Sequence, residues 1–166
     1  MSSDPLLVPE VVELVAELVA VGESVASAES LTAGLFAATV ASVPGSSAVL
    51  RGGLVVYATD LKATLAGVNP DRLTEDGPVS ERTARALATG AADRCGADWG
   101  VGLTGVAGPA EQDGHPVGTV YLGVAGPTGV TCDTLELAGD RWEIRRQTVL
   151  SAVSRLRERV AERAAR

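Results

Sequence analysis

Strand-like runs alternate with amphipathic, helix-like segments along most of this chain of 166 residues. The clearest helical pattern lies between Pro9 and Val21, where apolar residues recur every three or four positions and glutamates fall off that stripe. Trp99 to Thr104 has the apolar character of a strand buried in a sheet. The alternation predicts an α/β fold: a single three-layer α/β/α domain over residues 1–166, with a mixed, mostly parallel sheet.

The remaining elements follow from the same patterns. We expect further strands at 24–28, 52–57, 119–125 and 130–138, the last two joined as a hairpin by the turn 126–129. Further helices are expected at 32–42, 60–66, 81–95 and from residue 140 onward. Two stretches rich in glycine and proline, 67–78 and 105–118, are predicted to be loops.

Composition narrows the chemistry that the chain can perform. Lys62 is the only lysine and His115 the only histidine, and every other basic residue is arginine. Because a guanidinium stays protonated, arginine cannot replace lysine as a base. A zinc site would have to combine His115, Cys95, Cys132 and carboxylates, so we expect neither a metal nor a cofactor. The two cysteines are interpreted as small hydrophobic residues and not as a disulfide.

Charge and hydropathy exclude several kinds of partner. The net charge of −7 and the small number of aromatic side chains disfavour direct nucleic-acid binding. The start of the chain, Met-Ser-Ser-Asp-Pro, has an acid where a signal peptide needs a base, and no apolar run reaches the roughly 20 residues that cross a bilayer. We therefore expect a cytoplasmic protein without a membrane partner.

Arginine is concentrated in the last predicted helix, where residues 141–166 hold eight arginines and three glutamates. The run is either a nucleic-acid-binding tail or a solvated helix face, and we prefer the second interpretation. Arg141 is different, because it lies at the helix start, where the helix dipole disfavours a cation. An anionic ligand would explain a cation at that place.

Three segments could carry chemistry, because function in open α/β folds gathers beyond the carboxyl ends of strands. The turn 29–34 brings two hydroxyls, Ser30 and Thr32, to a helix start, where they either serve an active site or cap the helix. Tyr57 and Lys62 follow the next strand, where they are either a surface lysine beside a half-buried tyrosine or a catalytic pair, since a buried lysine can activate a serine. The segment 104–109 is either a ligand-binding backbone or an ordinary turn.

Taken together, these segments resemble the CinA C-terminal-domain family, whose characterised enzymatic members are nicotinamide-mononucleotide deamidases. The matching motifs, in chain order, are Ala-Glu-Ser-Leu-Thr-Ala-Gly at 28–34, Val-Pro-Gly-Ser-Ser-Ala at 43–48, Gly-Gly-Leu-Val-Val-Tyr at 52–57 with Lys62, Gly-Pro-Val-Ser at 77–80, Leu-Thr-Gly-Val-Ala-Gly-Pro at 103–109, Pro-Val-Gly-Thr-Val at 116–120 and Gly-Asp-Arg at 139–141. The chain is similar to the stand-alone form, which lacks the larger N-terminal molybdopterin-binding-like domain of many relatives.

The resemblance implies hydrolysis of the carboxamide of nicotinamide mononucleotide to nicotinate mononucleotide and ammonia, a step of pyridine-nucleotide salvage. Ser30 would be the nucleophile, Lys62 its base and Tyr57 a group that orients the lysine. Amides at the start of the second helix would stabilise the oxyanion. The resemblance also implies a homo-oligomer and these substrate-binding residues: Thr32, Ser46, Ser47, Thr104, Gly105 and Arg141.

The sequence departs from the family motif close to the expected nucleophile. Leu31 and Ala33 replace a cysteine and the first of two paired glycines, and the usual glycine-rich run after Pro109 is here Ala-Glu-Gln-Asp-Gly. These changes suggest lower activity or a different amide substrate. The alternative hypothesis is a non-catalytic, nucleotide-binding partner protein associated with competence or DNA damage.

Overall fold

A five-stranded sheet in the order β2-β1-β3-β4-β5 forms the middle layer of the computed structural model, which describes residues 4–166. The strands are β1 (Val25–Glu29), β2 (Leu50–Val55), β3 (Trp99–Gly105), β4 (Thr119–Gly126) and β5 (Gly129–Glu136). β1 pairs in parallel with both β2 and β3, whereas β4 is antiparallel to both of its neighbours. Only β4 therefore runs against the other strands, and the prediction of a mixed, mostly parallel sheet is confirmed.

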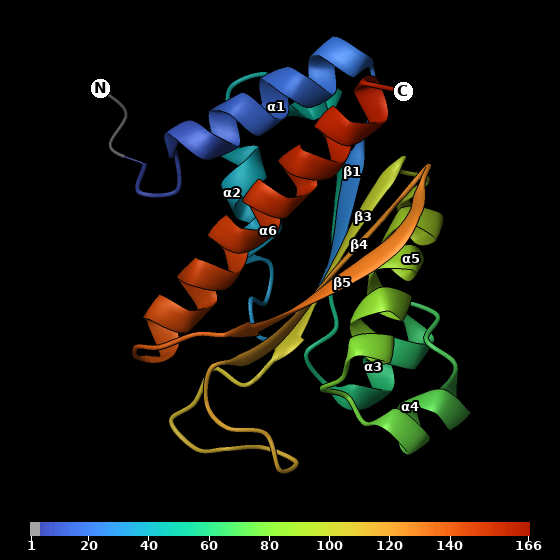
Figure 1. Cartoon of the computed structure of the whole chain (residues 1–166), viewed down its shortest axis with the longest axis vertical. Coiled ribbons are helices and arrows are strands. Elements are labelled where there is room, and N and C mark those ends of the chain that lie inside the picture. Colours follow the sequence, from blue (N-terminus) through green and yellow to red (C-terminus); the bar gives the residue numbers. More distant parts are fainter. Residues whose placement is uncertain (1–3) are drawn as a thin grey trace.

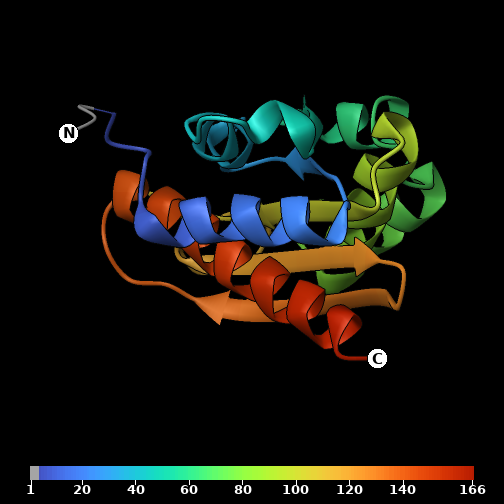
Figure 2. The same ribbon diagram turned by 90° about the horizontal axis from the view of Figure 1, so that it is seen from above.

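Helices cover both faces of the sheet (Figure 1). One face carries α1 (Pro9–Val21), α2 (Leu35–Ala41) and α6 (Arg141–Ala164), and the other carries α3 (Thr59–Thr64), α4 (Pro70–Asp76) and α5 (Glu81–Cys95). A short 3₁₀ turn, η1 (Ser46–Ala48), precedes β2. α1 and α6 lie side by side in both ribbon views (Figures 1 and 2). The predicted three-layer α/β/α architecture is confirmed.

The two faces of the sheet are packed in different ways. Large side chains, among them Phe36 and Trp99, fill the core beneath α1, α2 and α6. On the other face the sheet presents small residues, and α5 approaches it closely. A Cβ added to Gly102 would lie 2.4 Å from the Ala84 carbonyl oxygen, which is closer than real Cβ contacts. The absence of a side chain at this glycine of β3 therefore allows α5 to rest directly on the strand.

The prediction of a loop at 67–78 was wrong, because this stretch contains α4. The Asn69 side chain accepts hydrogen bonds from the backbone amides of Asp71 and Arg72 and caps the helix, and Pro70 occupies its first position. Asparagine followed by proline is a helix start as well as a turn signal. Buried Leu73 then anchors the short helix to the α5 side of the sheet.

The arginines of α6 are mostly bound within the fold. Arg155 pairs with Asp133 of β5, and Arg157 pairs with Glu13 and Glu17 of α1. These contacts support the interpretation of the run as a helix face that interacts with the protein itself. No helix in residues 4–166 combines the length and apolar character that crossing a membrane requires. The expectation that the chain has no signal peptide rests partly on residues 1–3, which lie outside the described residues.

The contact between Gly102 and α5 can be tested by one methyl group. We expect Gly102→Ala to lower the free energy of unfolding by about 1–3 kcal/mol, because the added Cβ overlaps backbone atoms of α5 that cannot move alone. Gly52→Ala is the matched control, since a Cβ there would meet only the Cys95 sulfur, at 3.3 Å. Urea denaturation of both variants measures the difference. Equal stability of the two variants would contradict the close packing of α5.

Candidate active site

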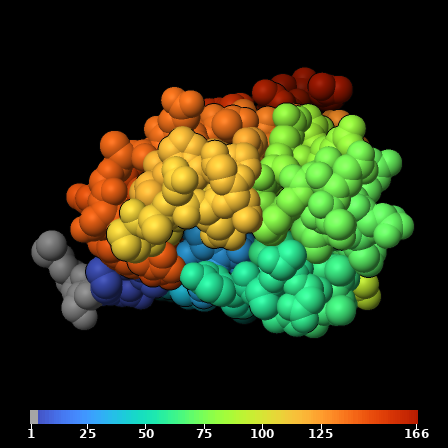
Figure 3. Space-filling model, turned by 90° about the horizontal axis from the view of Figure 1, so that it is seen from below, coloured from blue at the N-terminus to red at the C-terminus, as the bar shows by residue number. Residues whose placement is uncertain are grey.

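The carboxyl ends of three parallel strands meet at one edge of the sheet. The segments that leave β1, β2 and β3 enclose a cavity of about 150 Å³ there. Figure 3 looks onto this side, where blue atoms of the early chain lie between the yellow loop 105–118 and the teal segment near α3. The predicted site residues that line the cavity are Ser30, Tyr57, Lys62, Thr104, Gly105 and Arg141.

Ser30 and Lys62 contact each other inside this cavity. The Lys62 amine donates a hydrogen bond to Ser30 Oγ at 3.0 Å. It also donates to the carbonyl oxygens of Val56, at 2.8 Å, and Tyr57, at 3.4 Å. Among the described residues, no carboxylate accepts a hydrogen bond from this amine. The strand end of β2 thus fixes the amine against the serine that follows β1.

Burial leaves a larger fraction of Lys62 in the neutral, proton-accepting form at moderate pH. The side chain is only 2% exposed. Removal from water disfavours the ammonium form and lowers the pKa of Lys62 from 10.5 to about 8. Once neutral, the amine has a lone pair that can accept the proton of the Ser30 hydroxyl. The pair therefore has the geometry and the proton affinity of an activated nucleophile and its base.

Glu29, which the sequence analysis passed over, organises the turn from β1 to α2. Its fully buried carboxylate accepts hydrogen bonds from the backbone amides of Phe36, at 2.8 Å, and Ala37, at 3.2 Å. It also accepts one from the Ser27 hydroxyl. The amides of Phe36 and Ala37 in the first turn of α2 are therefore occupied, so the oxyanion donors expected at the start of the second helix have to come from the turn that precedes Leu35. The sequence feature that could have pointed to this role is the position of Glu29, an acid directly before the expected nucleophile.

Arg145 of α6 was also missed, and it holds the same turn from the outside. Its guanidinium donates to the carbonyl oxygens of Leu31, at 2.9 Å, and Thr32, at 3.2 Å. Within a trans peptide unit the carbonyl and the next amide point in opposite directions. The amides of Thr32 and Ala33 are thus turned away from Arg145. Neither Leu31 nor Thr32 has a hydrogen-bond partner for its own amide among the described residues. Leu31 lines the cavity, so its amide can meet a ligand oxygen there, whereas Thr32 is fully buried and does not line the cavity.

Ala33 adopts a left-handed backbone conformation, with φ of +48°. The family motif has glycine at this position, and a residue with a Cβ costs about 1 kcal/mol more in this conformation. Leu31, the other departure, is 4% exposed and packs into the core beneath α1, α2 and α6. Both residues are therefore accommodated in this turn, Ala33 at some cost in backbone energy and Leu31 by burial.

Tyr57 lies in the cavity, but its hydroxyl does not contact Lys62. The hydroxyl accepts a hydrogen bond from Arg141 at 2.8 Å, and Arg141 also donates to the Gly108 carbonyl oxygen. The expected orientation of the lysine comes instead from the backbone carbonyl of Tyr57. Arg141 is held at the start of α6 by a capping box between Asp140 and Glu143. The phenol and the guanidinium together form one wall of the cavity.

Of the other predicted substrate-binding residues, two line the cavity and three do not. Thr104 and Gly105 line the cavity, and the Thr104 hydroxyl donates to the Pro78 carbonyl oxygen at 2.6 Å. Thr32 is buried behind the cavity, and its hydroxyl has no partner among the described residues. Ser46 and Ser47 lie before β2, at the opposite edge of the sheet, because β2 runs parallel to β1. The prediction that this chain brings them to the cavity was wrong.

Comparison with known proteins assigns the chain to a family. A family model described as the CinA C-terminal domain matches residues 10–160. This chain belongs to the CinA C-terminal-domain family. A "CinA-like protein" of Frankia casuarinae is 47% identical over 138 residues, which are 83% of this chain and 32% of that protein. Another, from Anaeromyxobacter sp. (strain K), is 49% identical over 150 residues, which are 90% of this chain and 36% of that protein.

Solved structures of the family share the fold. The competence/damage inducible protein CihA from Agrobacterium tumefaciens is 36% identical, with a TM-score of 0.84 over 94% of this chain and 97% of that one. A CinA superfamily protein from Klebsiella pneumoniae is 29% identical, with a TM-score of 0.88 over 92% of this chain and 97% of that one. The chain spans about a third of the length of the curated relatives named above. The family that the motifs resemble is thus confirmed.

The burial of Lys62 predicts how stability depends on pH. Below pH 8 the amine is charged in the folded and unfolded states, and burying the charge destabilises the fold. Between about pH 8 and 10.5 the unfolded chain binds more protons, so the stability of the wild type relative to Lys62→Met should rise with pH. Urea denaturation of both proteins across this range measures the difference. A constant difference would show that Lys62 is not desolvated.

Proposed function

We propose that this chain hydrolyses the carboxamide of nicotinamide mononucleotide to nicotinate mononucleotide and ammonia. The observation that carries the proposal is the 3.0 Å contact between Ser30 Oγ and the buried Lys62 amine, inside a cavity at the carboxyl edge of the sheet. Family membership and the matching motifs support the choice of substrate.

Ser30 and Lys62 can perform both halves of the reaction. Neutral Lys62 takes the hydroxyl proton as Ser30 Oγ attacks the amide carbon, and the resulting ammonium gives a proton to the departing nitrogen. Ammonia leaves, and the acyl group remains on Ser30. A water molecule then attacks this ester while Lys62 accepts its proton, and the proton returns to Ser30 Oγ as the acid is released. The carbonyls of Val56 and Tyr57 hold the amine in place throughout.

The turn after Ser30 supplies a donor for the oxyanion. The amide of Leu31 directly follows the nucleophile, lines the cavity and has no partner among the described residues. Arg145 holds the next two peptide units of the turn through the carbonyls of Leu31 and Thr32. Such a preorganised donor stabilises the negative charge that develops on the amide oxygen. Glu29 contributes by keeping the start of α2 in one position.

The cavity is small for a whole nucleotide. Its volume of about 150 Å³ is below the range of pockets that enclose entire ligands, so the ring with its carboxamide would enter and the ribose phosphate would extend outward. Arg141 lines the cavity and is exposed to solvent, and a guanidinium has five N–H donors. After its bonds to Gly108 and Tyr57, donors remain for a phosphate oxygen.

A second candidate function is nucleotide binding without turnover. Ala33 in a left-handed conformation close to the proposed oxyanion donor favours it, because the family motif has glycine there. A "putative competence-damage inducible protein" of Streptococcus pneumoniae is 41% identical over 146 residues. Binding of the nucleotide without ammonia release, for every carboxamide in a small panel, would select this function.

The catalytic pair can be tested by ammonia release. We expect the wild type to release ammonia from nicotinamide mononucleotide, and Ser30→Ala and Lys62→Arg to lower kcat by about 10²–10⁴-fold, because neither variant retains a nucleophile with its base. Lys62→Arg keeps a positive charge but cannot accept a proton, so it distinguishes the loss of the base from the loss of the charge. Arg166→Gln, an exposed arginine beyond α6, is the control.

The pH profile adds an independent measurement on the same reaction. The rate should rise as the pH passes about 8, where Lys62 becomes neutral. Normal turnover by Lys62→Arg, or a rate independent of pH between 7 and 9, would refute the lysine-base mechanism.

Arg141 can be tested by comparing two substrates. We expect Arg141→Met to raise KM for the nucleotide by about tenfold or more, because a charge-assisted hydrogen bond to the phosphate is lost. The corresponding nucleoside, which lacks the phosphate, should show a much smaller change. Steady-state kinetics on both substrates gives the ratio. Equal effects would show that Arg141 only shapes the cavity wall through Tyr57 and Gly108.

A further inference from the structure

A second, larger depression lies on the outer surface of α5, away from the candidate active site. Its volume is about 760 Å³, and it is bounded by α5, α4 and the segment that joins α3 to α4. It shares no lining residue with the active-site cavity. We call it the α5 groove, with these lining residues: Ala66, Gly67, Arg72, Arg82, Arg85, Ala86, Thr89, Gly90, Asp93 and Arg94.

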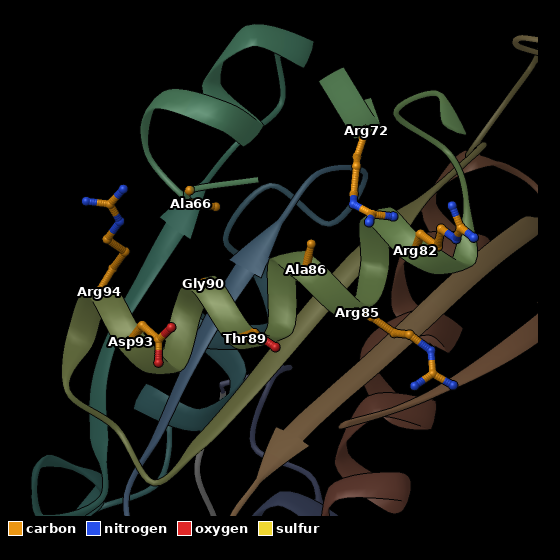
Figure 4. A pocket seen from close by; sticks show the side chains of 10 residues that line it. Ala66, Arg72, Arg82, Arg85, Ala86, Thr89, Gly90, Asp93 and Arg94 are labelled. Atoms are coloured by element: carbon orange, nitrogen blue, oxygen red, sulfur yellow. The ribbon is translucent and has the colours of Figure 1, made fainter. Parts of the chain in front are cut away.

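Positive charge is concentrated in the α5 groove although the chain as a whole is acidic. Four arginines and a single aspartate line it, whereas the net charge of the chain is −7. Figure 4 shows Arg72 reaching from α4 toward α5, with Arg82 and Arg94 near opposite ends of that helix. Because like charges repel, an anionic group bound among these arginines would be favoured.

Groups of the protein itself pair with only some of these arginines. Arg85 pairs with Glu81 and donates to the Val130 carbonyl oxygen, and Arg82 lies 3.5 Å from Asp76. The exposed guanidinium groups of Arg72 and Arg94 have no hydrogen bond or ion pair with any of residues 4–166. Arg82 is also in the first turn of α5, where the helix dipole disfavours a cation. The groove thus offers unused donors.

The floor of the α5 groove is made of backbone and very small side chains. At Gly90 the helix approaches the Ala66 carbonyl so closely that a Cβ would lie 1.8 Å from its oxygen. Ala86 and Thr89 extend this low surface along the helix. Arg82 and Arg94 are twelve residues apart, which on an α-helix is roughly 18 Å. Because the Ala66 carbonyl covers Gly90, a peptide main chain would lie over Ala86 and Thr89, beside the segment 66–67, while its side chains reach the arginines.

We propose that the α5 groove binds an acidic segment of a partner protein, whose carboxylates pair with Arg72, Arg82 and Arg94. Guanidinium groups bind carboxylates through paired hydrogen bonds, and the elongated shape suits an extended chain. Nucleic acid fits less well, because no aromatic side chain lines the groove to stack on a base.

The test uses a labelled peptide of about six glutamates, which in extended form covers the roughly 18 Å between the outer arginines. Fluorescence anisotropy at low salt measures its binding to the full chain. We expect Arg72→Gln/Arg94→Gln to weaken binding by about tenfold, since two exposed charge pairs are lost. Arg146→Gln/Arg166→Gln removes two exposed arginines outside the groove and should change the affinity by less than about twofold.

Several outcomes would overturn the proposal. These are no binding of the glutamate peptide, equal binding of a glutamine peptide of the same length, or equal losses in the two double variants. Tighter binding of a thymidine oligonucleotide, lost in Arg72→Gln/Arg94→Gln, would assign the groove to nucleic acid. Loss of self-association in that variant would assign it to a second copy of the chain. Thermal unfolding of each variant verifies that its fold is intact.

Discussion

The buried amine of Lys62 is the constraint around which this edge of the molecule is built. An amine removed from water needs hydrogen-bond acceptors, and the carbonyls at the end of β2 together with the Ser30 hydroxyl provide them. Since these acceptors are neutral, they do not offset the free energy that the ammonium form loses when it is removed from water. The same arrangement that weakens the charged form leaves the amine ready to act as a base.

Two other charged groups shape the nucleophile turn without entering the cavity. Glu29 binds the amides that begin α2 from within the core, and Arg145 binds two carbonyls of the turn from α6. The carboxylate binds donors at the start of α2, and the guanidinium binds acceptors in the turn, so both ends of the segment that follows Ser30 are fixed. The shape of this segment therefore depends on two charged residues that do not line the cavity.

Local patterns in the sequence were enough to predict the layers of the fold, the helix Pro9–Val21 and the segments that leave the parallel strands. They were also enough to single out Lys62, because it is the only lysine. The roles of Glu29 and Arg145 depend on contacts between distant segments, and no local pattern reports such contacts. Ser46 and Ser47 show the opposite error: a motif marks family membership but not the edge of the sheet at which its residues lie. The helix α4 was missed because asparagine and proline are common to turns and helix starts.

The close seating of α5 on the glycines of β3 and β4 has a consequence for how this fold can change. Where α5 rests on these glycines, the contact is made with strand backbone, and no strand side chain stands there that could be exchanged to alter the position of the helix. The scaffold behind the cavity is therefore fixed in shape, and a new substrate preference has to arise in the segments that leave the strands. Leu31, Ala33 and the loop 105–118 belong to those segments. The residues that can change the substrate and the residues that hold α5 on the sheet are therefore different parts of the chain.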